Sequence, residues 1–488
     1  MLNIGIDLGT SSVKLLLVDQ DGAIIKEAVR EYPLEFPHPG WSQQAPADWI
    51  EGTRGALKEL LTDIDAAQVR AIGVGGQMHG LVALDREDKV IRPAILWNDG
   101  RTAQETEWLN TAVGKDRLTR LTGNIAFAGF TAPKLLWMKK HESESFSRIA
   151  RIMLPKDYLV YWLTGVHCCE PSDASGMLLY DVKNRRWSAE MLEICGISES
   201  QMPRLCESSE AVGTVKEELA DELGLRADTV VCAGAGDNAA AAVGCGIVGP
   251  GKCNISLGTS GTVFITSDRF SVDPGNALHS FAHADGGYHQ MGCILSAASC
   301  NKWWMDILGA EDYSQQQRDI IRLGENSVFY LPYLMGERSP HNDTDARAAF
   351  VGMTMDTGRG EMTQAVLEGV AFAIRDCVEA ARAQGIELTS SMLCGGGAKS
   401  RLWRRILANV LGMRLTVPQT EQGPAYGAAI LAAVAAGEYG SVAQCAQKWV
   451  TVAETIEPER ELSEKYEAQY RRWHKLYPAL KDFFKGGN

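Results

Sequence analysis

The sequence lacks the features that would place it on a nucleic acid or in a membrane. Its formal net charge is −13 over 488 residues, and repulsion from polyanions makes nucleic acids and anionic membranes poor partners. No apolar run reaches the roughly 18 residues that a membrane span needs. The chain opens with Met-Leu-Asn-Ile-Gly, without a basic segment. We therefore expect no signal peptide and a cytoplasmic location.

Metal-binding and redox signatures are also missing. The twelve cysteines include no C-x-x-C pair, and the nine histidines add no metal-ligand spacing. Several cysteines lie in apolar runs, where reduced cysteine packs as a small hydrophobe. The sequence thus predicts packed thiols and no structural zinc. What is present is an ordinary globular composition, 45% hydrophobic and 22% charged, in a chain long enough for two or three domains.

A short stretch occurs twice in the chain. Ile-Asp-Leu-Gly-Thr-Ser at 6–11 returns as Ile-Ser-Leu-Gly-Thr-Ser at 255–260. Apolar runs on both sides of each Gly-Thr-Ser turn predict two strand–turn–strand hairpins. Glycine followed by small hydroxyl residues lets backbone N–H groups approach a phosphate. We therefore expect two similar domains facing each other across a nucleotide, with Asp7, which the second copy lacks, serving a metal ion.

Asp237 is the most informative single carboxylate. It follows an expected buried strand at 229–233 and two glycines, and it precedes an alanine-rich helix at 239–243. This position suits an ordinary helix N-cap and equally a general base that a substrate hydroxyl can approach. The two roles are compatible, because the helix N-terminus favours the carboxylate form.

Two more glycine-rich segments follow expected strands. Gln77, Met78 and His79 come directly after a Gly-Gly pair and offer neutral groups suited to sugar hydroxyls, although a structural role for the histidine stays open. The stretch Gly-Gly-Gly-Ala-Lys-Ser at 395–400 has alanine where a P-loop needs glycine. Its glycines allow a flat or anionic ligand to approach closely, or simply tight strand–helix packing.

The pattern also predicts the main elements. We expect a strand over 23–31 that completes a three-stranded meander, and a helix capped by Asp48. A second meander is expected over 81–85 and 90–97. The segment 101–230 should be mainly helical, and long helices are expected at 362–384 and 461–484.

These segments together resemble the FGGY family of carbohydrate kinases over essentially the whole chain. Further matching segments are Ala-Ile-Leu-Trp-Asn-Asp-Gly-Arg at 94–101, Gly-Phe-Thr-Ala-Pro-Lys-Leu-Leu-Trp at 129–137, Leu-Pro-Lys-Asp-Tyr at 154–158 and Gly-Glu-Arg-Ser-Pro-His at 336–341. The resemblance implies an α/β fold with two actin-like, ribonuclease-H-like domains flanking a catalytic cleft. Residues 1–246 would bind the sugar and carry the catalytic base near their end, and residues 247–488 would bind the nucleotide.

The resemblance also implies a role for individual residues. Asp237 matches the family's catalytic base and Asp7 its acidic residue near Mg²⁺. The remaining matches are, for the sugar, Gln77, Met78, His79 and Asn238; for the phosphates of ATP, Thr10, Ser11, Lys14, Gly258 and Thr259; and for the adenosine, Gly396, Gly397 and Ala398. Lys14 is equally consistent with a solvated strand lysine. Ala235 departs from the glycine that the family often has there, and its methyl group narrows the approach to Asp237.

The implied reaction is the MgATP-dependent phosphorylation of D-xylulose at its terminal hydroxyl, a step in pentose catabolism. The Gln-Met-His triplet favours xylulose over glycerol, gluconate or ribulose, which remain alternatives. An actin-like or chaperone-like ATPase would leave the triplet without a role, and intact Asp7 and Asp237 argue against a sugar-binding regulator. The sequence does not decide the epimer or the oligomeric state, and it is compatible with a homodimer.

Overall fold

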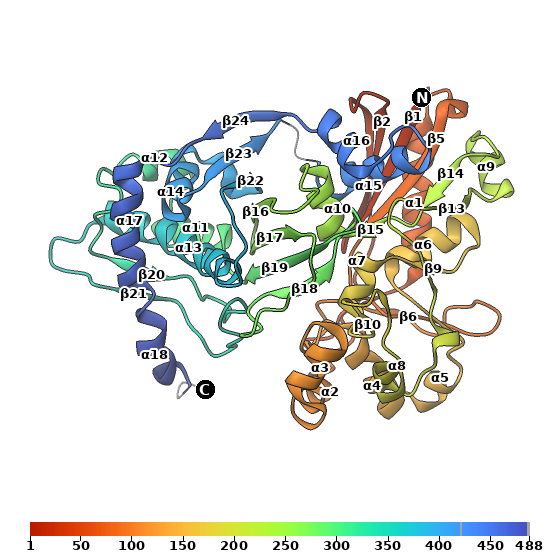
Figure 1. The fold of residues 1–488 in the computed structure, drawn as a ribbon, viewed down its shortest axis with the longest axis horizontal. Helices are drawn as coiled ribbons and strands as arrows, with labels where there is room; N and C mark the ends of the chain where they lie inside the picture. The colour runs from red at the N-terminus through yellow and green to blue at the C-terminus, as the bar shows by residue number, and fades with distance from the viewer. Residues whose placement is uncertain (420–421, 486–488) are drawn as a thin grey trace.

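Two sheets of seven strands organise the described residues, 1–419 and 422–485, of this computed structural model (Figure 1). The N-terminal sheet has the order β13-β14-β5-β1-β2-β3, with β15 also paired to β5. Its strands are β1 (Leu2–Leu8), β2 (Ser12–Asp19), β3 (Ile24–Glu31), β5 (Val69–Gly76), β13 (Ala211–Thr214), β14 (Val230–Cys232) and β15 (Ala235–Gly236). The helices of this half are α1 (Pro46–Leu61), α2 (Ala103–Trp108), α3 (Lys115–Thr122), α4 (Thr131–His141), α5 (Ser143–Ser147), α6 (Pro155–Thr164), α7 (Pro171–Ala174), α8 (Ala189–Cys195), α9 (Glu217–Leu223) and α10 (Asp237–Gly244).

The C-terminal sheet has the order β18-β19-β17-β16-β22-β23-β24. Its strands are β16 (Cys253–Leu257), β17 (Gly261–Ser267), β18 (His279–Ala282), β19 (Tyr288–Ile294), β22 (Ser390–Cys394), β23 (Arg414–Pro418) and β24 (Val452–Ile456). The helices are α11 (Ala298–Leu308), α12 (Tyr313–Gln317), α13 (Arg359–Arg382), α14 (Arg401–Leu411), α15 (Gly423–Ala435), α16 (Val442–Trp449), α17 (Arg460–Trp473) and α18 (Leu476–Phe484). Short two-stranded sheets pair β4 (Gln43–Gln44) with β7 (Ala94–Ile95), β6 (Val82–Leu84) with β8 (Arg151–Met153), β9 (Cys168–Cys169) with β12 (Arg204–Leu205), β10 (Tyr180–Asp181) with β11 (Arg186–Trp187), and β20 (Phe329–Leu331) with β21 (Ala349–Val351).

Both predicted hairpins are confirmed. β1 pairs with β2 in an antiparallel register that places Asp7 opposite Lys14. β16 pairs with β17 in the same way and places Ser256 opposite Thr262. β3 adds to β2 and completes the expected meander. The turn sequence and the alternating apolar residues beside it are local signals, which is why the sequence predicts these hairpins well.

The end of the chain returns to the first sheet. α15 packs against β1, β5 and α10, and in Figure 1 its blue ribbon lies beside the red strands of the N-terminal half. Small residues make the contact possible: a Cβ on Gly5 would lie 1.9 Å from the carbonyl oxygen of Ala425, and one on Gly73 would lie 2.0 Å from that of Ala428. Part of the N-terminal sheet is therefore covered by a helix from beyond position 420.

Three element predictions are wrong in whole or in part. α1 begins at Pro46, with Ala45 as its N-cap, so Asp48 lies in the first turn and does not cap it. The expected second meander is confirmed only in part: single antiparallel bridges join Leu81 to Ile95 and Leu84 to Val90, but the longer pairings are those of β6 with the distant β8 and of β7 with β4. The expected last helix is two helices, α17 and α18.

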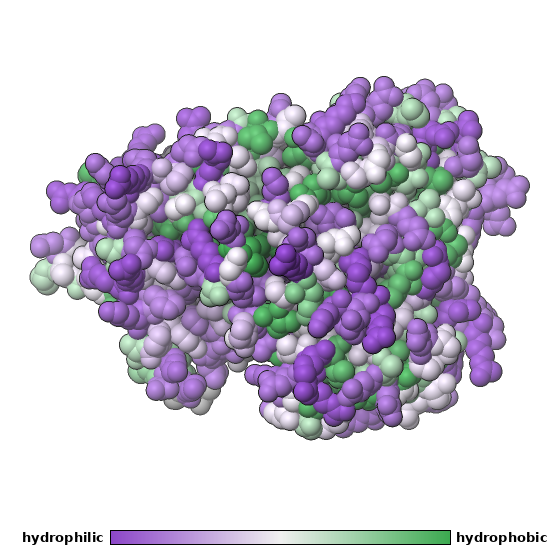
Figure 2. Space-filling model, viewed as in Figure 1, coloured by the Kyte–Doolittle hydropathy of each residue, from purple (hydrophilic) through white to green (hydrophobic). Residues whose placement is uncertain are grey.

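No described cysteine forms a disulfide, and all are buried except the half-buried Cys293, as expected for packed thiols. No helix in the described part of the chain is both long and apolar enough to cross a membrane. On the face shown in Figure 2, hydrophilic residues cover the outer rims, and hydrophobic ones form small areas toward the middle of the molecule.

Candidate active site

Three neighbouring strands bring the predicted acidic and sugar-contacting residues to one edge of the N-terminal sheet. β1, β5 and β15 run parallel, with Asp7 level with Gly75 and Ala235 level with the same Gly75. Gln77 follows the end of β5, and Asp237 follows the end of β15. The carboxyl ends of parallel strands are where open α/β sheets bind ligands. The structure thus groups residues that lie 230 positions apart in the sequence (7 and 237).

Asp237 is the first residue of α10, and Gly236 is the N-cap, so the capping interpretation of this carboxylate is wrong. Its Oδ1 accepts hydrogen bonds from Asn238, at 2.7 Å from the backbone N–H and 3.0 Å from Nδ2. Burial raises the pKa of Asp237 to about 6, and the Asn238 donors limit that rise. Asp237 is therefore mostly ionised at neutral pH and able to accept a proton.

Asp7 lies close enough to Asp237 for the two charges to repel. Burial, followed by the negative charge of Asp237, raises the pKa of Asp7 to about 7, while Lys14 opposes the rise. Among the described residues, none donates a hydrogen bond to the Asp7 carboxylate. A carboxylate without protein donors, beside a second carboxylate, is a donor set that fits Mg²⁺.

The described residues hold no group of three or more potential metal ligands. Mg²⁺ bound through one or two carboxylates keeps waters and substrate phosphates as its other ligands. The arrangement around Asp7 therefore suits a cation that arrives with a nucleotide.

In the first Gly-Thr-Ser turn the carbonyl groups are engaged, and so is the Gly9 N–H, which donates to the carbonyl oxygen of Ser12 at 3.0 Å. Gln44 Nε2 donates to the carbonyl oxygen of Thr10 at 2.8 Å, and the Tyr32 N–H donates to that of Ser11 at 3.1 Å. Trp97 Nε1 donates to Thr10 Oγ1 at 2.9 Å. Within the described chain, the N–H groups of Thr10 and Ser11 have no acceptor. A turn that offers only donors is suited to a phosphate.

The second turn repeats this arrangement with different partners. The Ala298 N–H donates to the carbonyl oxygen of Gly258 at 2.8 Å, and Ser299 Oγ donates to that of Thr259 at 2.7 Å. No described residue accepts a hydrogen bond from the N–H groups of Thr259 and Ser260. The two hairpins therefore share a chemical property as well as a sequence.

The triple glycine lies next to the second turn. β16 and β22 are parallel, with Ser256 level with Cys394, so residues 395–398 leave the sheet beside Gly258. Gly395 has a φ of 90°, and a Cβ there would lie 2.6 Å from the Leu257 backbone. A Cβ on Gly396, in contrast, would meet nothing within 4 Å. Gly396 thus borders open space that a flat ligand can fill.

Gly397 and Ala398 have a different environment. A Cβ on Gly397 would lie 2.9 Å from the Leu257 side chain and the Trp403 ring. Ala398 is buried, and its carbonyl oxygen accepts a hydrogen bond from Arg404 Nε. Both residues therefore support the packing of this loop, and only Gly396 faces open space.

His79 is held in one orientation by its surroundings. Its φ is 69°, in the left-handed region that few residues other than glycine adopt. Lys134 Nζ donates to its carbonyl oxygen at 2.7 Å, and the ring stacks on Phe130 with centroids 4.7 Å apart. His79 Nδ1 lies 2.8 Å from the carbonyl oxygen of Gly176.

These contacts fix the protonation state of His79. Because a carbonyl oxygen only accepts, Nδ1 carries the hydrogen. Burial, followed by the positive charge of Lys134, lowers the pKa of His79 to about 3. The ring is therefore neutral, and Nε2 is left as a hydrogen-bond acceptor.

Met78 contacts the segment that carries Asp237, whereas Gln77 lies beside the first turn, where its Nε2 donates to the carbonyl oxygen of Gly9 at 3.3 Å. Met78 is buried against Gly236, whose Cβ, if present, would lie 3.0 Å from Met78 Sδ, and Asn238 Nδ2 approaches the same sulfur at 4.0 Å. Gln77 Oε1 is buried without a hydrogen-bond partner. An unpartnered buried acceptor costs free energy unless a ligand supplies a donor.

Several residues at this site had no role assigned from the sequence. Tyr32, Gln44 and Trp97 hold the first turn, and Lys134 holds His79. Lys134 is fully buried. The sequence signal for its role is its position, directly after a proline and within an apolar run. The sequence did not show what Gln44 contacts, because its partner Thr10 lies 34 residues away.

The site thus combines the carboxyl ends of parallel strands from both sheets, two turns with unbonded N–H groups and a pair of carboxylates. An enzyme that transfers phosphate needs these parts. The chain belongs to the FGGY family of carbohydrate kinases: residues 2–244 match the family's N-terminal domain and residues 253–436 its C-terminal domain.

Individual relatives match over nearly the full length. The chain is 41% identical to the xylulose kinase of Escherichia coli (strain K12) over 481 residues, which cover 98% of this chain and 99% of the relative. The crystal structure of a kinase from Brucella ovis, described as a xyloylose kinase, superposes with a TM-score of 0.95 at 44% identity, covering 99% of this chain and all of that one. A gluconate kinase from Lactobacillus acidophilus has the same TM-score at 25% identity, with full coverage of both chains.

These matches confirm the predicted fold class, the two-domain actin-like α/β architecture of the family. They also confirm the predicted class of enzyme, an ATP-dependent carbohydrate kinase. Because the xylulose kinase and the gluconate kinase share one fold, the fold does not select the sugar. The roles of individual site residues, and the boundary between residues 246 and 247, stay predictions.

Proposed function

We propose that this enzyme transfers the γ-phosphoryl group of MgATP to the terminal hydroxyl of D-xylulose, giving D-xylulose 5-phosphate. The observation that carries the choice of sugar is the full-length similarity to xylulose kinases, at 41% identity for the Escherichia coli enzyme and 37% for that of Bacillus subtilis. We place the sugar on the N-terminal half (1–246) and the nucleotide on the C-terminal half (247–488).

Asp237 is the general base in this proposal. Its side chain is recessed at the edge of the sheet, and its pKa of about 6 lies close to the working pH, where a base is both ionised and able to take a proton. It would accept the proton of the sugar hydroxyl as the oxygen attacks phosphorus. Ala235 belongs to a buried apolar cluster with Ala239 and Ala240, so we expect its methyl group to leave the approach to Asp237 open.

The sugar contacts follow from the acceptors that the structure leaves free. His79 Nε2 and Gln77 Oε1 both accept hydrogen bonds, so each pairs with a sugar hydroxyl. Met78 supplies an apolar wall, and Asn238 completes the site beside Asp237. A sugar that lacks one of these hydroxyls would leave a buried acceptor unpaired, at a cost of roughly 1–3 kcal/mol.

The phosphates are held by the two turns. Thr10 and Ser11 on one side and Gly258 and Thr259 on the other offer N–H and hydroxyl donors, and Lys14 adds a positive charge. Phosphoryl transfer depends mainly on such positioning and on charge neutralisation. Asp7 would hold Mg²⁺, which neutralises phosphate charge when bound. Gly396, with Gly397 and Ala398 behind it, would lie against the adenosine.

A coupled ADP-release assay with MgATP tests the proposal. D-xylulose, L-xylulose, D-ribulose, L-ribulose, glycerol and gluconate are compared at equal concentration. We expect strong stimulation by D-xylulose and only weak ATP hydrolysis without sugar. A stronger response to another compound would replace D-xylulose as the substrate. Steady ATP hydrolysis that no compound stimulates would contradict the kinase assignment.

A further inference from the structure

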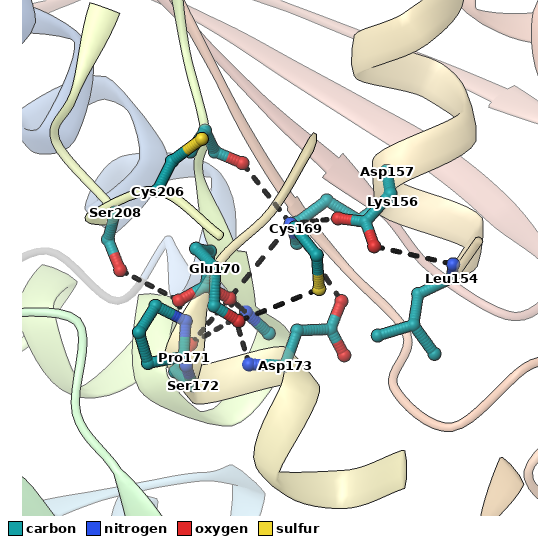
Figure 3. A network of polar contacts seen from close by, with 12 residues as sticks. Leu154, Lys156, Asp157, Cys169, Glu170, Pro171, Ser172, Asp173, Cys206 and Ser208 are labelled. Carbon is teal, nitrogen blue, oxygen red and sulfur yellow. Dashed lines mark hydrogen bonds and ion pairs between the residues drawn. The ribbon is translucent and has the colours of Figure 1, made fainter. Parts of the chain in front are cut away.

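A buried polar network lies directly behind Asp237. Lys156, near the start of α6, has a side chain with no solvent exposure. Its Nζ donates to Asp157 Oδ1 at 2.7 Å and lies 3.9 Å from both Glu170 Oε1 and Asp173 Oδ2 (Figure 3). Burial alone lowers the pKa of Lys156, but Asp157, Glu170 and Asp173 together raise it well above its ordinary value. Lys156 is therefore a buried cation.

The network reaches the segment that leads into Asp237. Lys156 Nζ donates to the carbonyl oxygen of Ala233 at 3.2 Å. The N–H of Gly236 donates to Glu170 Oε1 at 3.2 Å and to Ser172 Oγ at 3.1 Å. Both ends of the four-residue segment 233–236 are thus held, and Gly236 is the residue bonded covalently to Asp237.

Glu170 connects the parts of this network. Its two oxygens accept from the N–H and Oγ of Ser172, from the N–H of Asp173 and from Ser208 Oγ, each at 2.8 Å. Glu170 therefore caps α7 and binds the segment before Asp237 with the same carboxylate. Figure 3 shows Ser172, Asp173 and Ser208 gathered around it.

We propose, on the basis of the proposed function of Asp237 as the base, that Lys156, Glu170 and Ser172 are positioning residues that fix the 233–236 segment and so aim the Asp237 carboxylate at the sugar hydroxyl. Asp237 makes its only described side-chain hydrogen bonds to its own neighbour, Asn238. Its direction therefore depends on the backbone that carries it. A misplacement of about 1 Å in a reacting group can reduce the rate by about 10²-fold.

Lys134 offers a matched comparison. It is also a fully buried lysine directly after a proline near the start of a helix. Its Nζ donates to the carbonyl oxygens of His79 and Gly129, each at 2.7 Å. Lys134 thus supports the sugar contact, whereas Lys156 supports the base. The two lysines should affect different kinetic constants.

The experiment measures kcat, KM for D-xylulose, KM for ATP and the melting temperature of four variants of the full chain. We expect Lys156→Met to lower kcat at least tenfold with both KM values within threefold of wild type. Ser172→Ala, which keeps the buried charges, should lower kcat about three- to tenfold. Lys134→Met should instead raise KM for D-xylulose at least fivefold, with a smaller change in kcat.

The fourth variant, Asp237→Asn, tests the base assignment separately from the positioning role of Lys156, Glu170 and Ser172. Turnover retained by Asp237→Asn would remove the base assignment itself. An inactive Asp237→Asn together with a folded Lys156→Met or Ser172→Ala within twofold of wild-type kcat would overturn only the positioning role. A rise in KM for D-xylulose as large as the fall in kcat would also overturn it, because general loosening has that result. If Lys156→Met does not fold, Ser172→Ala decides alone.

Discussion

Asp237 determines how the reaction should depend on pH. Its pKa of about 6 is raised by burial, so protonation removes the base as the pH falls. At saturating MgATP, where the bound cation keeps Asp7 ionised, we expect kcat/KM for the sugar to be flat above about pH 7 and to fall tenfold per pH unit well below pH 6. Asp237→Asn should lower kcat by about 10²–10⁴-fold and change the dissociation constant of ATP by less than threefold.

These two measurements use steady-state kinetics from pH 5 to pH 8.5 and a nucleotide titration of the variant. A wild-type profile without an acid limb would contradict the role of Asp237. So would an Asp237→Asn variant that turns over at the wild-type rate.

Asp7 should lower the stability of the folded enzyme at neutral pH. Its pKa rises from 3.8 to about 7 on folding, through burial and then repulsion from Asp237. The folded state therefore binds this proton more tightly, and stability is lost as the pH rises from about 4 to about 7. We expect Asp7→Asn to raise the melting temperature at pH 8 by about 1–4 °C while abolishing activity.

The pH dependence of this gain provides its control. At pH 5 the carboxyl of folded wild type is protonated, but that of the unfolded chain is still ionised, so the difference in melting temperature should fall to less than half and vanish only below about pH 4. A gain that is as large at pH 5 as at pH 8, measured by calorimetry without nucleotide, would show that the charge is not its cause.

At the scale of single elements, the contact between α10 and α15 depends on glycine. A Cβ on Gly427 would lie 1.8 Å from the carbonyl oxygen of Ala240, so even alanine forces the two helices apart. We expect Gly427→Ala to destabilise the protein by about 3 kcal/mol, the upper part of the range for overpacking. Thermal unfolding of the purified variant measures this.

Gly55 is the control for this change. It also lies within a helix, α1, but a Cβ there would come no closer than 3.7 Å to another residue, at Arg30 Nε. Gly55→Ala should stabilise the protein by about 0.5–1 kcal/mol, because alanine has the higher helix propensity. Equal melting temperatures for the two variants would contradict the packing argument.

The sequence predicts those elements whose signals are local. Both hairpins and α13 were expected close to their observed bounds, and β5 and β22 are the strands expected before the two glycine-rich segments. The break between α17 and α18 also has a local cause: Pro478 has no N–H to donate to the carbonyl of His474, and α17 ends at Trp473.

Elements whose partners are distant were not predictable in this way. β6 is a strand because it pairs with β8, 69 positions further along (82 to 151). The same holds for the site. The strand ends that carry Asp7, Gln77 and Asp237 could be expected from glycines and apolar runs, but the contact of Lys156 with Ala233 spans 77 residues. Only the folded chain shows which buried lysine serves which part of the site.

At the scale of the whole molecule, we expect that the two halves are not separate folding units. α15 covers β1 and β5 through contacts at Gly5 and Gly73, and Tyr426 Oη donates to the carbonyl oxygen of Gly22 at 2.8 Å. A fragment of residues 1–246 would expose this face of its sheet to water. We expect the fragment to be insoluble, or to unfold without a cooperative transition, because the apolar surface under α15 is left uncovered.

Restoring the missing helices should reverse this defect. Fusing residues 422–450, which contain α15 and α16, to the fragment through a flexible linker should give a soluble protein with a cooperative melting transition. The same fusion carrying Gly427→Ala should not, because its α15 cannot approach α10. A fragment 1–246 that melts cooperatively by itself, followed by circular dichroism, would mean that the N-terminal sheet does not need α15. The boundary after residue 246 would then separate two folding units as well as the sugar and nucleotide sites. The C-terminal helices would serve only to connect the two halves.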